Sequence, residues 1–141
     1  SAAIQFLTGT ATPCTSVFKP LWVDTPAAWP KTAASERFDP ESLFWRHERL
    51  HRLAIGDYAH RINVYAPERE GLEVEFMTRA LSTPSNDQAA RETVAHNAFE
   101  RAWAAEQAWC RAILKDRPKN SSGLCFNLAW QKRNKKAGFP V

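Results

Sequence analysis

Hydrophobic positions recur at two spacings along the chain, with a short alternation near the start and helical steps after residue 40. The segment 3–7 (Ala-Ile-Gln-Phe-Leu) and the segment 15–23 have extended patterns, and turn residues separate them. Both segments are predicted to be strands. Because a pair of strands is a marginal structure in isolation, we expect residues 1–23 to form a strand pair that completes a larger sheet.

A stretch without periodicity follows the strands. Residues 24–40 contain Pro26, Pro30 and Pro40, as is typical of a connection that runs over the surface. Asp39 is predicted to cap a helix that has Pro40 at its first position. We therefore expect three parts of one larger domain, which are the strand pair (1–23), this connection (24–40) and a helical region (41–141).

The helical region is predicted to hold four to five helices, which makes the expected fold class α+β and mainly helical. The first ends at Gly56, and the others cover about 58–66, 67–81, 84–116 and 124–137. Their helical-period apolar positions predict buried faces. These positions are Leu43, Phe44, Leu50, Ala54 and Ile55; Leu72, Phe76 and Ala80; Val94, Ala98, Ala102, Ala105, Trp109 and Ala112; and Leu124, Phe126, Leu128, Ala129 and Trp130.

The amino-acid composition is typical of a globular protein. The 141 residues are 44% hydrophobic and 24% charged, and no apolar run is long enough for a membrane span. The formal charge of +4 is concentrated after residue 114, where seven Lys and Arg residues face Asp116 alone. No recognised nucleic-acid-binding module accompanies this basic tail, so we expect no nucleic-acid partner and no membrane partner.

The cysteine and aromatic residues indicate the redox compartment and the presence of an interface. Cys14, Cys110 and Cys125 are odd in number and widely spaced, which argues against a disulfide framework and against Cys-x-x-Cys chemistry. A reducing compartment, the cytoplasm, suits them best. Six Trp and eight Phe residues predict a packed interface in addition to a core. A non-enzymatic helical interaction module is therefore one functional hypothesis.

The segment His47-Glu48-Arg49-Leu50-His51 is the most catalytic-looking motif in the chain. On a helix, two histidines four residues apart can bind one zinc ion, and the glutamate between them can activate the bound water. A zinc metallopeptidase is therefore another functional hypothesis. The helical pattern places both histidines on the apolar side, whereas Trp45, Glu48, Arg49 and Arg52 are expected to point away from it, with Glu48 and Arg52 at pairing distance.

Two features weaken the zinc hypothesis. Arg46, Arg49 and Arg52 lie in or beside the motif, where positive charge disfavours a divalent cation. Asp57 lies six residues after His51, where a third ligand could stand, but Ala54 occupies the place of the glycine that would turn the chain. We therefore interpret the segment as a packing helix with inward histidines, and we expect no metal and no cofactor.

Other nucleophile candidates lack supporting residues in the sequence. Ser1 could use its own α-amine as a base, although the Ser-Ala-Ala start disfavours this role. A hydroxyl nucleophile would need a nearby histidine and carboxylate, and no such arrangement is visible in sequence for Thr8, Thr10, Thr15 or Ser16. Lys19, which precedes Pro20, is interpreted as a solvated lysine at a strand end.

Four segments together resemble the secernin and dipeptidase family of N-terminal-nucleophile hydrolases. The more specific two are the Thr8-Gly9-Thr10 turn with Pro13-Cys14-Thr15-Ser16-Val17-Phe18-Lys19-Pro20-Leu21-Trp22, and Ser42-Leu43-Phe44-Trp45-Arg46-His47-Glu48-Arg49-Leu50-His51-Arg52. Glu68-Arg69-Glu70-Gly71-Leu72-Glu73 and the ending from Ala129 to Gly138 are similar as well. The resemblance extends over nearly the whole chain, but it covers only the C-terminal portion of the family's longer polypeptide.

The resemblance implies a supporting role. The family's catalytic residue is an N-terminal cysteine exposed by processing, and Cys14 does not match it. No catalytic, cofactor-binding or metal-binding residue is therefore carried over to this chain. The implied fold stacks helices on two sheets. The implied partners are the N-terminal catalytic portion and, in the intact enzyme, a small peptide substrate. A second copy of the chain is a further candidate partner, independent of the resemblance. Alone, the chain is expected to be inactive.

Overall fold

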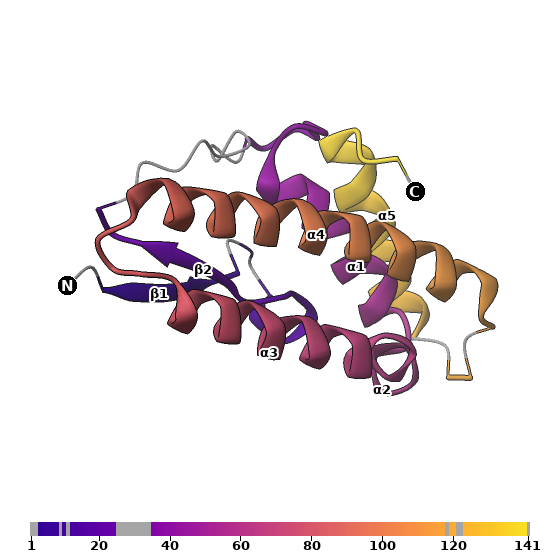
Figure 1. Cartoon of the computed structure of the whole chain (residues 1–141). Helices are drawn as coiled ribbons and strands as arrows, with labels where there is room; N and C mark the ends of the chain where they lie inside the picture. Colours follow the sequence, from indigo (N-terminus) through magenta and orange to yellow (C-terminus); the bar gives the residue numbers. More distant parts are fainter. Residues whose placement is uncertain are drawn as a thin grey trace.

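The computed structural model describes residues 3–8, 10, 12–24, 35–117, 119–120 and 123–140, and these form a mainly helical α+β structure (Figure 1). The predicted fold class is thus confirmed. The strands are β1 (Ile4–Leu7) and β2 (Lys19–Trp22), and two 3₁₀ turns are η1 (Pro13–Thr15) and η2 (Ile62–Val64). The helices are α1 (Leu43–Ile55), α2 (Tyr58–Arg61), α3 (Ala66–Ser82), α4 (Gln88–Lys115) and α5 (Leu124–Ala137). Ser1 and most of the predicted connection, residues 25–34, lie outside the described residues.

The predicted strand pair is present as an antiparallel ribbon. β1 pairs with β2 so that Ile4 is opposite Trp22 and Leu7 is opposite Lys19. Trp22 is buried with Ala80 and Ala95, and Ile4 packs beside it. The second strand starts later than predicted because Pro13 opens η1, whose turn hydrogen bonds keep residues 13–16 out of the ladder. The ribbon is therefore anchored to α3 and α4 mainly through Trp22, and Phe6 packs against the same cluster.

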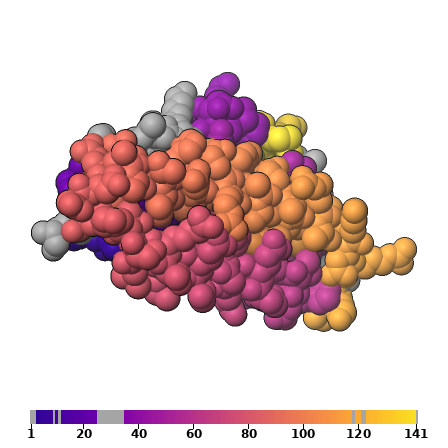
Figure 2. Space-filling model, in the orientation of Figure 1, coloured from indigo at the N-terminus to yellow at the C-terminus, as the bar shows by residue number. Residues whose placement is uncertain are grey.

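Helix α4 runs the length of the molecule with α3 alongside it, the strand pair lies near one end, and α1 lies against the middle of α4 (Figure 1). On the face shown in Figure 2, α3 and α4 pack against each other along most of their length. The alanine-rich face predicted for α4 is confirmed, since Ala98, Ala102 and Trp109 lie in the main core. Small side chains there allow neighbouring elements to approach α4 closely.

Two helices begin later than predicted because capping groups define their starts. Before α1, the carboxylate of Asp39 accepts a hydrogen bond from the Glu41 N–H, and the Asp39 carbonyl accepts one from the Ser42 N–H. This turn delays the helix to Leu43. Before α4, Asp87 Oδ1 accepts a hydrogen bond from the Ala90 N–H at 2.9 Å, so α4 starts at Gln88 and not at the predicted Pro84. The bounds of α3 and α5 agree with the prediction to within a residue.

The outward orientation predicted for two residues of α1 is wrong. Trp45 is 4% exposed and Glu48 is 3% exposed. Trp45 is covered by Phe38 and by Phe139, which follows α5, and Glu48 is enclosed by the hydrogen bonds described below. Helix α1 is therefore buried on two sides. Within the described residues, no helix is both long and apolar enough to cross a membrane.

The apolar residues of α5 also differ from the prediction, because Leu124, Phe126 and Leu128 are exposed. Helix α5 is held mainly by its C-terminal half. There Arg52 donates a hydrogen bond to Asn134, and the Ala137 carbonyl accepts one from the Phe38 N–H at 2.8 Å. The first turns of α5 thus present an apolar surface.

Candidate functional site

The first histidine of the motif connects three elements. His47 lies on α1, is 1% exposed, and has both ring nitrogens at hydrogen-bonding distance of a partner. Its Nε2 is 3.0 Å from Thr15 Oγ1 on η1, and its Nδ1 is 3.0 Å from Glu106 Oε1 on α4. A hydroxyl, an imidazole and a carboxylate are therefore aligned across the interior.

The second histidine repeats this arrangement nearer the surface. His51 Nε2 is 3.2 Å from Thr12 Oγ1, and His51 Nδ1 is 3.1 Å from Glu48 Oε1. The other oxygen of Glu48 accepts a hydrogen bond from Arg52 Nε at 2.8 Å. Burial raises the pKa of Glu48, but the hydrogen bonds from His51 and Arg52 outweigh this effect and hold the pKa below its ordinary value.

The chain of contacts Thr15–His47–Glu106 is called here the buried relay, and Thr12–His51–Glu48 the outer relay. Both form because the spacing of the two histidines on α1 matches the spacing of the two threonines at η1. Four residues of an α-helix advance by roughly 6 Å, and three residues of a 3₁₀ turn also advance by roughly 6 Å. His47 and His51 on α1 are therefore in register with Thr15 and Thr12 at the η1 turn. The spacing that suits a zinc site on a helix also suits this pair of hydroxyls.

Counting hydrogens distinguishes the two rings. The Thr15 hydroxyl donates its one hydrogen to the Thr12 carbonyl at 3.0 Å, so it accepts from His47 Nε2. His47 Nδ1 faces the Glu106 carboxylate, so both nitrogens of this ring face oxygen acceptors. The Thr12 hydroxyl can donate to His51 Nε2, whereas His51 Nδ1 faces the Glu48 carboxylate. His47 therefore lies between two acceptors, and His51 lies between a donor and an acceptor.

The geometry favours the packing interpretation over a zinc site. Both nitrogens of each histidine face protein partners, and Glu48, which would activate water, is bonded to His51 and Arg52. Asp57, the candidate third ligand, accepts hydrogen bonds from the Lys119 and Asn120 N–H groups. In the part of the chain that the structure describes, no group of three His, Cys, Asp or Glu side chains is placed to hold a metal ion.

Glu106 is the central residue of the buried relay, and the sequence reasoning missed it. Its Oε1 accepts from Ser16 Oγ at 3.4 Å as well as from His47. One sequence feature could have indicated that Glu106 is buried. It lies four residues after Ala102 and three before Trp109, on the buried face of α4. A carboxylate there needs polar partners from other elements.

Lys19 was predicted to be solvated, and this prediction is wrong. Its side chain is 2% exposed because β2 packs on α4, and its Nζ donates to the Val17 carbonyl at 2.6 Å and lies 5.2 Å from the centre of the Phe99 ring. Burial lowers the pKa of Lys19 to about 8, although the nearby charge of Glu106 opposes the shift. Lys19 and Glu106 are thus two buried charged groups that stabilise one another.

The η1 turn is also fixed from outside the relays. Tyr65 donates from its hydroxyl to the Thr15 carbonyl at 3.2 Å and stacks on Trp109 with ring centres 4.8 Å apart. Arg69 donates to the Cys14 carbonyl. Residues of α1, α3 and α4 therefore hold the η1 turn, and with it the Thr15 hydroxyl, in a fixed position.

A hydroxyl, imidazole and carboxylate in line can activate a nucleophile, and the structure brings together groups that looked unconnected in sequence. Thr15, however, is 0% exposed and Ser16 is 1% exposed, so a substrate carbonyl has no path to either oxygen. Thr8 accepts a hydrogen bond from the Thr10 N–H instead of taking part in a relay. The arrangement therefore positions elements and does not present a nucleophile.

The remaining thiols differ in environment. Cys14 and Cys125 are exposed, whereas Cys110 is buried in the main core. Burial raises the pKa of the Cys110 thiol to about 12, so it remains protonated at neutral pH. Cys110 is a core residue and not a nucleophile.

The chain matches no family model, no curated protein and no solved structure.

Proposed function

We propose that the chain is the C-terminal region of a secernin-like cysteine dipeptidase or amidohydrolase, with a structural role beside the substrate cleft. The main observation behind this proposal is that the two segments with the most specific family resemblance contact each other through buried hydrogen bonds. Thr15 of the first segment bonds His47 of the second, and Ser16 bonds the same Glu106 carboxylate as His47. These contacts support interpreting the two segments as parts of one structural unit.

The enclosure of the buried relay is consistent with a structural, non-catalytic role for this chain in the proposed enzyme. The hydroxyls beside the histidines are enclosed by α1, α3 and α4, so the nucleophile would come from elsewhere in the intact protein. In the proposed enzyme, an N-terminal cysteine thiol attacks the amide carbonyl while its own α-amine accepts the proton. The C–N bond then breaks, the leaving amine takes up a proton, and water hydrolyses the thioester. None of these steps uses a residue of this chain.

The strand ribbon is consistent with a missing sheet. Among the described residues, β1 is paired only with β2, and a two-stranded ribbon is marginal without further strands. Leu7 and Phe18 are each 39% exposed beside it. We propose that the N-terminal portion adds strands here and covers these side chains.

A non-enzymatic interaction module is the second candidate. It is favoured by the exposed apolar residues on α5 and on α3, which are Leu124, Phe126 and Leu128, and Val74, Met77 and Leu81. Exposed apolar residues gathered on helices are common at interfaces. The sequence that precedes the chain in its gene separates the candidates, because the hydrolase needs a processable cysteine there and the module does not.

We expect the purified chain to hydrolyse no dipeptide. The physical reason is that the enclosed hydroxyls cannot reach a substrate and that the hydrogen-bond partner of Cys14 is the Tyr58 hydroxyl, whose raised pKa makes it a poor base at neutral pH. The measurement is release of free amino acids from a dipeptide panel, for the wild type and for Cys14→Ser, with and without a thiol-blocking reagent. Turnover by the wild type would contradict the proposal; loss of that turnover in Cys14→Ser would place the nucleophile at Cys14, and turnover that persists in Cys14→Ser and after blocking would place it at another residue of the chain.

A further inference from the structure

The outer side of helix α3 carries a row of exposed residues that is mainly apolar. Its members recur at steps of four, three and four residues, and we call them the α3 row: Glu70, Val74, Met77 and Leu81. Val74 is 58% exposed and Leu81 is 68% exposed, and Figure 2 shows α3 at the surface of the molecule. Such steps place side chains in one line along a helix, which is the arrangement through which two helices pack.

A groove of about 340 Å³ adjoins the α3 row. Val74 and Met77 form its helix side together with two carboxylates, those of Glu70 and Glu73, and aromatic side chains of the strand ribbon region form the other side. None of the residues that line the groove is Lys or Arg. This surface therefore combines apolar side chains with negative charge, and it suits a partner that has apolar and positive groups.

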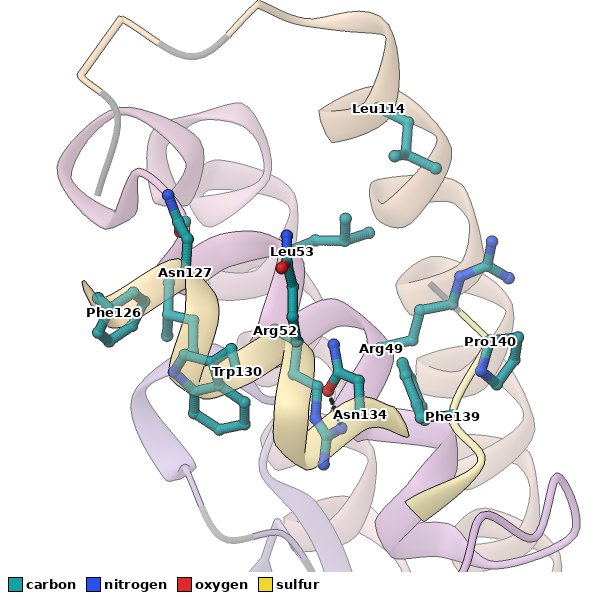
Figure 3. A pocket seen from close by; sticks show the side chains of 13 residues that line it. Arg49, Arg52, Leu53, Leu114, Phe126, Asn127, Trp130, Asn134, Phe139 and Pro140 are labelled. Carbon is teal, nitrogen blue, oxygen red and sulfur yellow. Dashed lines mark hydrogen bonds between the residues drawn. The ribbon is translucent and has the colours of Figure 1, made fainter. Parts of the chain in front are cut away.

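Helix α5 carries the opposite charge beside a similar apolar row. Trp130 and Asn134 lie on the side of α5 that contacts Arg52 of α1 (Figure 3). Another side holds a row with the same steps of four, three and four residues, which we call the α5 row: Leu124, Leu128, Gln131 and Lys135. All members of the α5 row are exposed. The helix has four Lys and Arg residues and no acidic residue.

The two rows match when the helices run antiparallel. Because the steps are the same, one register aligns all four positions: Leu81 is opposite Leu124, Met77 opposite Leu128, Val74 opposite Gln131, and Glu70 opposite Lys135. The same register places Glu73 opposite Lys132, beside the rows. Apolar side chains therefore meet at one end of the contact, and carboxylates meet ammonium groups at the other end.

This contact has to form between two copies of the chain, because both rows are exposed within a single copy. Pairing of either row with itself is less favourable. Two antiparallel α3 rows would place Glu70 opposite Leu81, and two antiparallel α5 rows would place Lys135 opposite Leu124. In both cases a charged group would lose water without gaining a polar partner.

We propose that α5 of one copy of the chain docks antiparallel on the α3 row of a second copy. Because the two surfaces differ, copies join head to tail, and association continues past the dimer unless a ring closes. Two helices in contact over about three turns bury less than the roughly 1,200 Å² of a stable complex, so we expect a Kd on the order of 100 µM. The inference does not rest on the proposed hydrolase role, because neither row contains a residue of the buried relay.

The test is sedimentation equilibrium of the full chain at concentrations up to about 1 mM, where a contact of this strength is measurable. The weight-average mass of the wild type is expected to rise with concentration above the monomer mass. Two double variants, Glu70→Lys with Met77→Lys and Leu128→Glu with Lys135→Glu, are each expected to raise the Kd at least about tenfold. Each places like charges opposite one another and a charge opposite an apolar side chain.

An equimolar mixture of the two double variants is expected to regain the association of the wild type. The new lysines of one variant then face the new glutamates of the other, and the two unchanged rows face each other. Glu100→Lys with Arg111→Glu is the matched control, since both residues are exposed on α4 and lie outside the rows, and it should associate as the wild type does. A monomeric wild type, wild-type association by either double variant alone, or a mixture that stays monomeric would overturn the proposal.

Cross-linking tests the register without changing any charge. Met77→Cys and Leu128→Cys are made in separate chains that also carry Cys14→Ser and Cys125→Ser, which removes the exposed thiols. Oxidation of an equimolar mixture is expected to give mainly the disulfide between unlike chains, because Met77 is opposite Leu128 in the register. A statistical mixture of cross-links between like and unlike chains would contradict the pairing of α3 with α5.

Discussion

Replacing Glu106 with glutamine is expected to lower the free energy of unfolding by about 3 kcal/mol or more. Removal of one partner from a buried charged pair commonly costs about 3–5 kcal/mol, because the other charge is left uncompensated. In this chain the loss would affect His47 and Ser16, which bond the carboxylate, and the buried ammonium of Lys19. The amide of glutamine would also direct N–H groups toward groups that are donors.

The measurement is urea unfolding at neutral pH, and Glu100→Gln is the matched control. Glu100 lies on the same helix but is exposed, so its replacement should change the free energy of unfolding by less than about 0.5 kcal/mol. Equal effects of the two substitutions would show that the relay does not stabilise the fold.

The titration of Lys19 is expected to contribute a rise of about 1 kcal/mol to the free energy of unfolding between pH 8 and pH 9, of which the titration of Cys110 cancels roughly a third. The pKa of Lys19 is about 8 in the folded chain, compared with an ordinary value of 10.5. Between these values the unfolded chain binds one more proton than the folded chain, so stability increases with pH at up to about 1.4 kcal/mol per pH unit. Below pH 8 the charged ammonium of Lys19 is buried, and its desolvation destabilises the fold.

Two other groups reverse the trend at higher pH. Burial raises the pKa of Cys110 from 9.0 to about 12, so above pH 9 the unfolded chain loses this proton first and stability falls. Burial also raises the pKa of Tyr65 above its ordinary value of 10.0, which adds a second loss above pH 10. We therefore expect a rise from pH 8 to 9, a plateau to about pH 10, and then a decline.

Urea unfolding at pH 7, 8, 9 and 10 measures this profile, and two variants assign its parts. Lys19→Met should remove the rise between pH 8 and 9 because it removes the titrating group. Cys110→Ala should extend the rise toward pH 10. A wild-type stability that falls steadily from pH 8 to pH 9 would be incompatible with a buried Lys19 ammonium.

The secondary structure was predictable where local signals agree. The alanine-rich period of α4, the Pro67 start of α3 and the extent of α5 are all recorded in short-range sequence patterns. The starts of α1 and α4 were misplaced because two cap-plus-proline signals lie a few residues before the observed helices. A capping residue followed by proline is compatible with a non-helical turn as well as with the first turn of a helix.

The candidate site was only partly predictable, because its contacts join residues that are distant in sequence. The inward direction of His47 follows from the helical period, but its partner Glu106 lies 59 residues away. The burial of Trp45 depends on Phe139, and the burial of Lys19 depends on α4. A period of 3.6 residues identifies the first buried face of a helix, whereas a second buried face depends on which element packs there.

The two histidines of the motif bond threonine and glutamate side chains, and we expect that they do not bind a metal. The most direct test records long-range ¹H–¹⁵N spectra of both imidazole rings at neutral pH, before and after one equivalent of Zn²⁺. We expect hydrogens on both nitrogens of His47, a hydrogen on Nδ1 alone for His51, and no change when zinc is added. A stoichiometric shift of the ring nitrogens of both His47 and His51 on addition of zinc would contradict it.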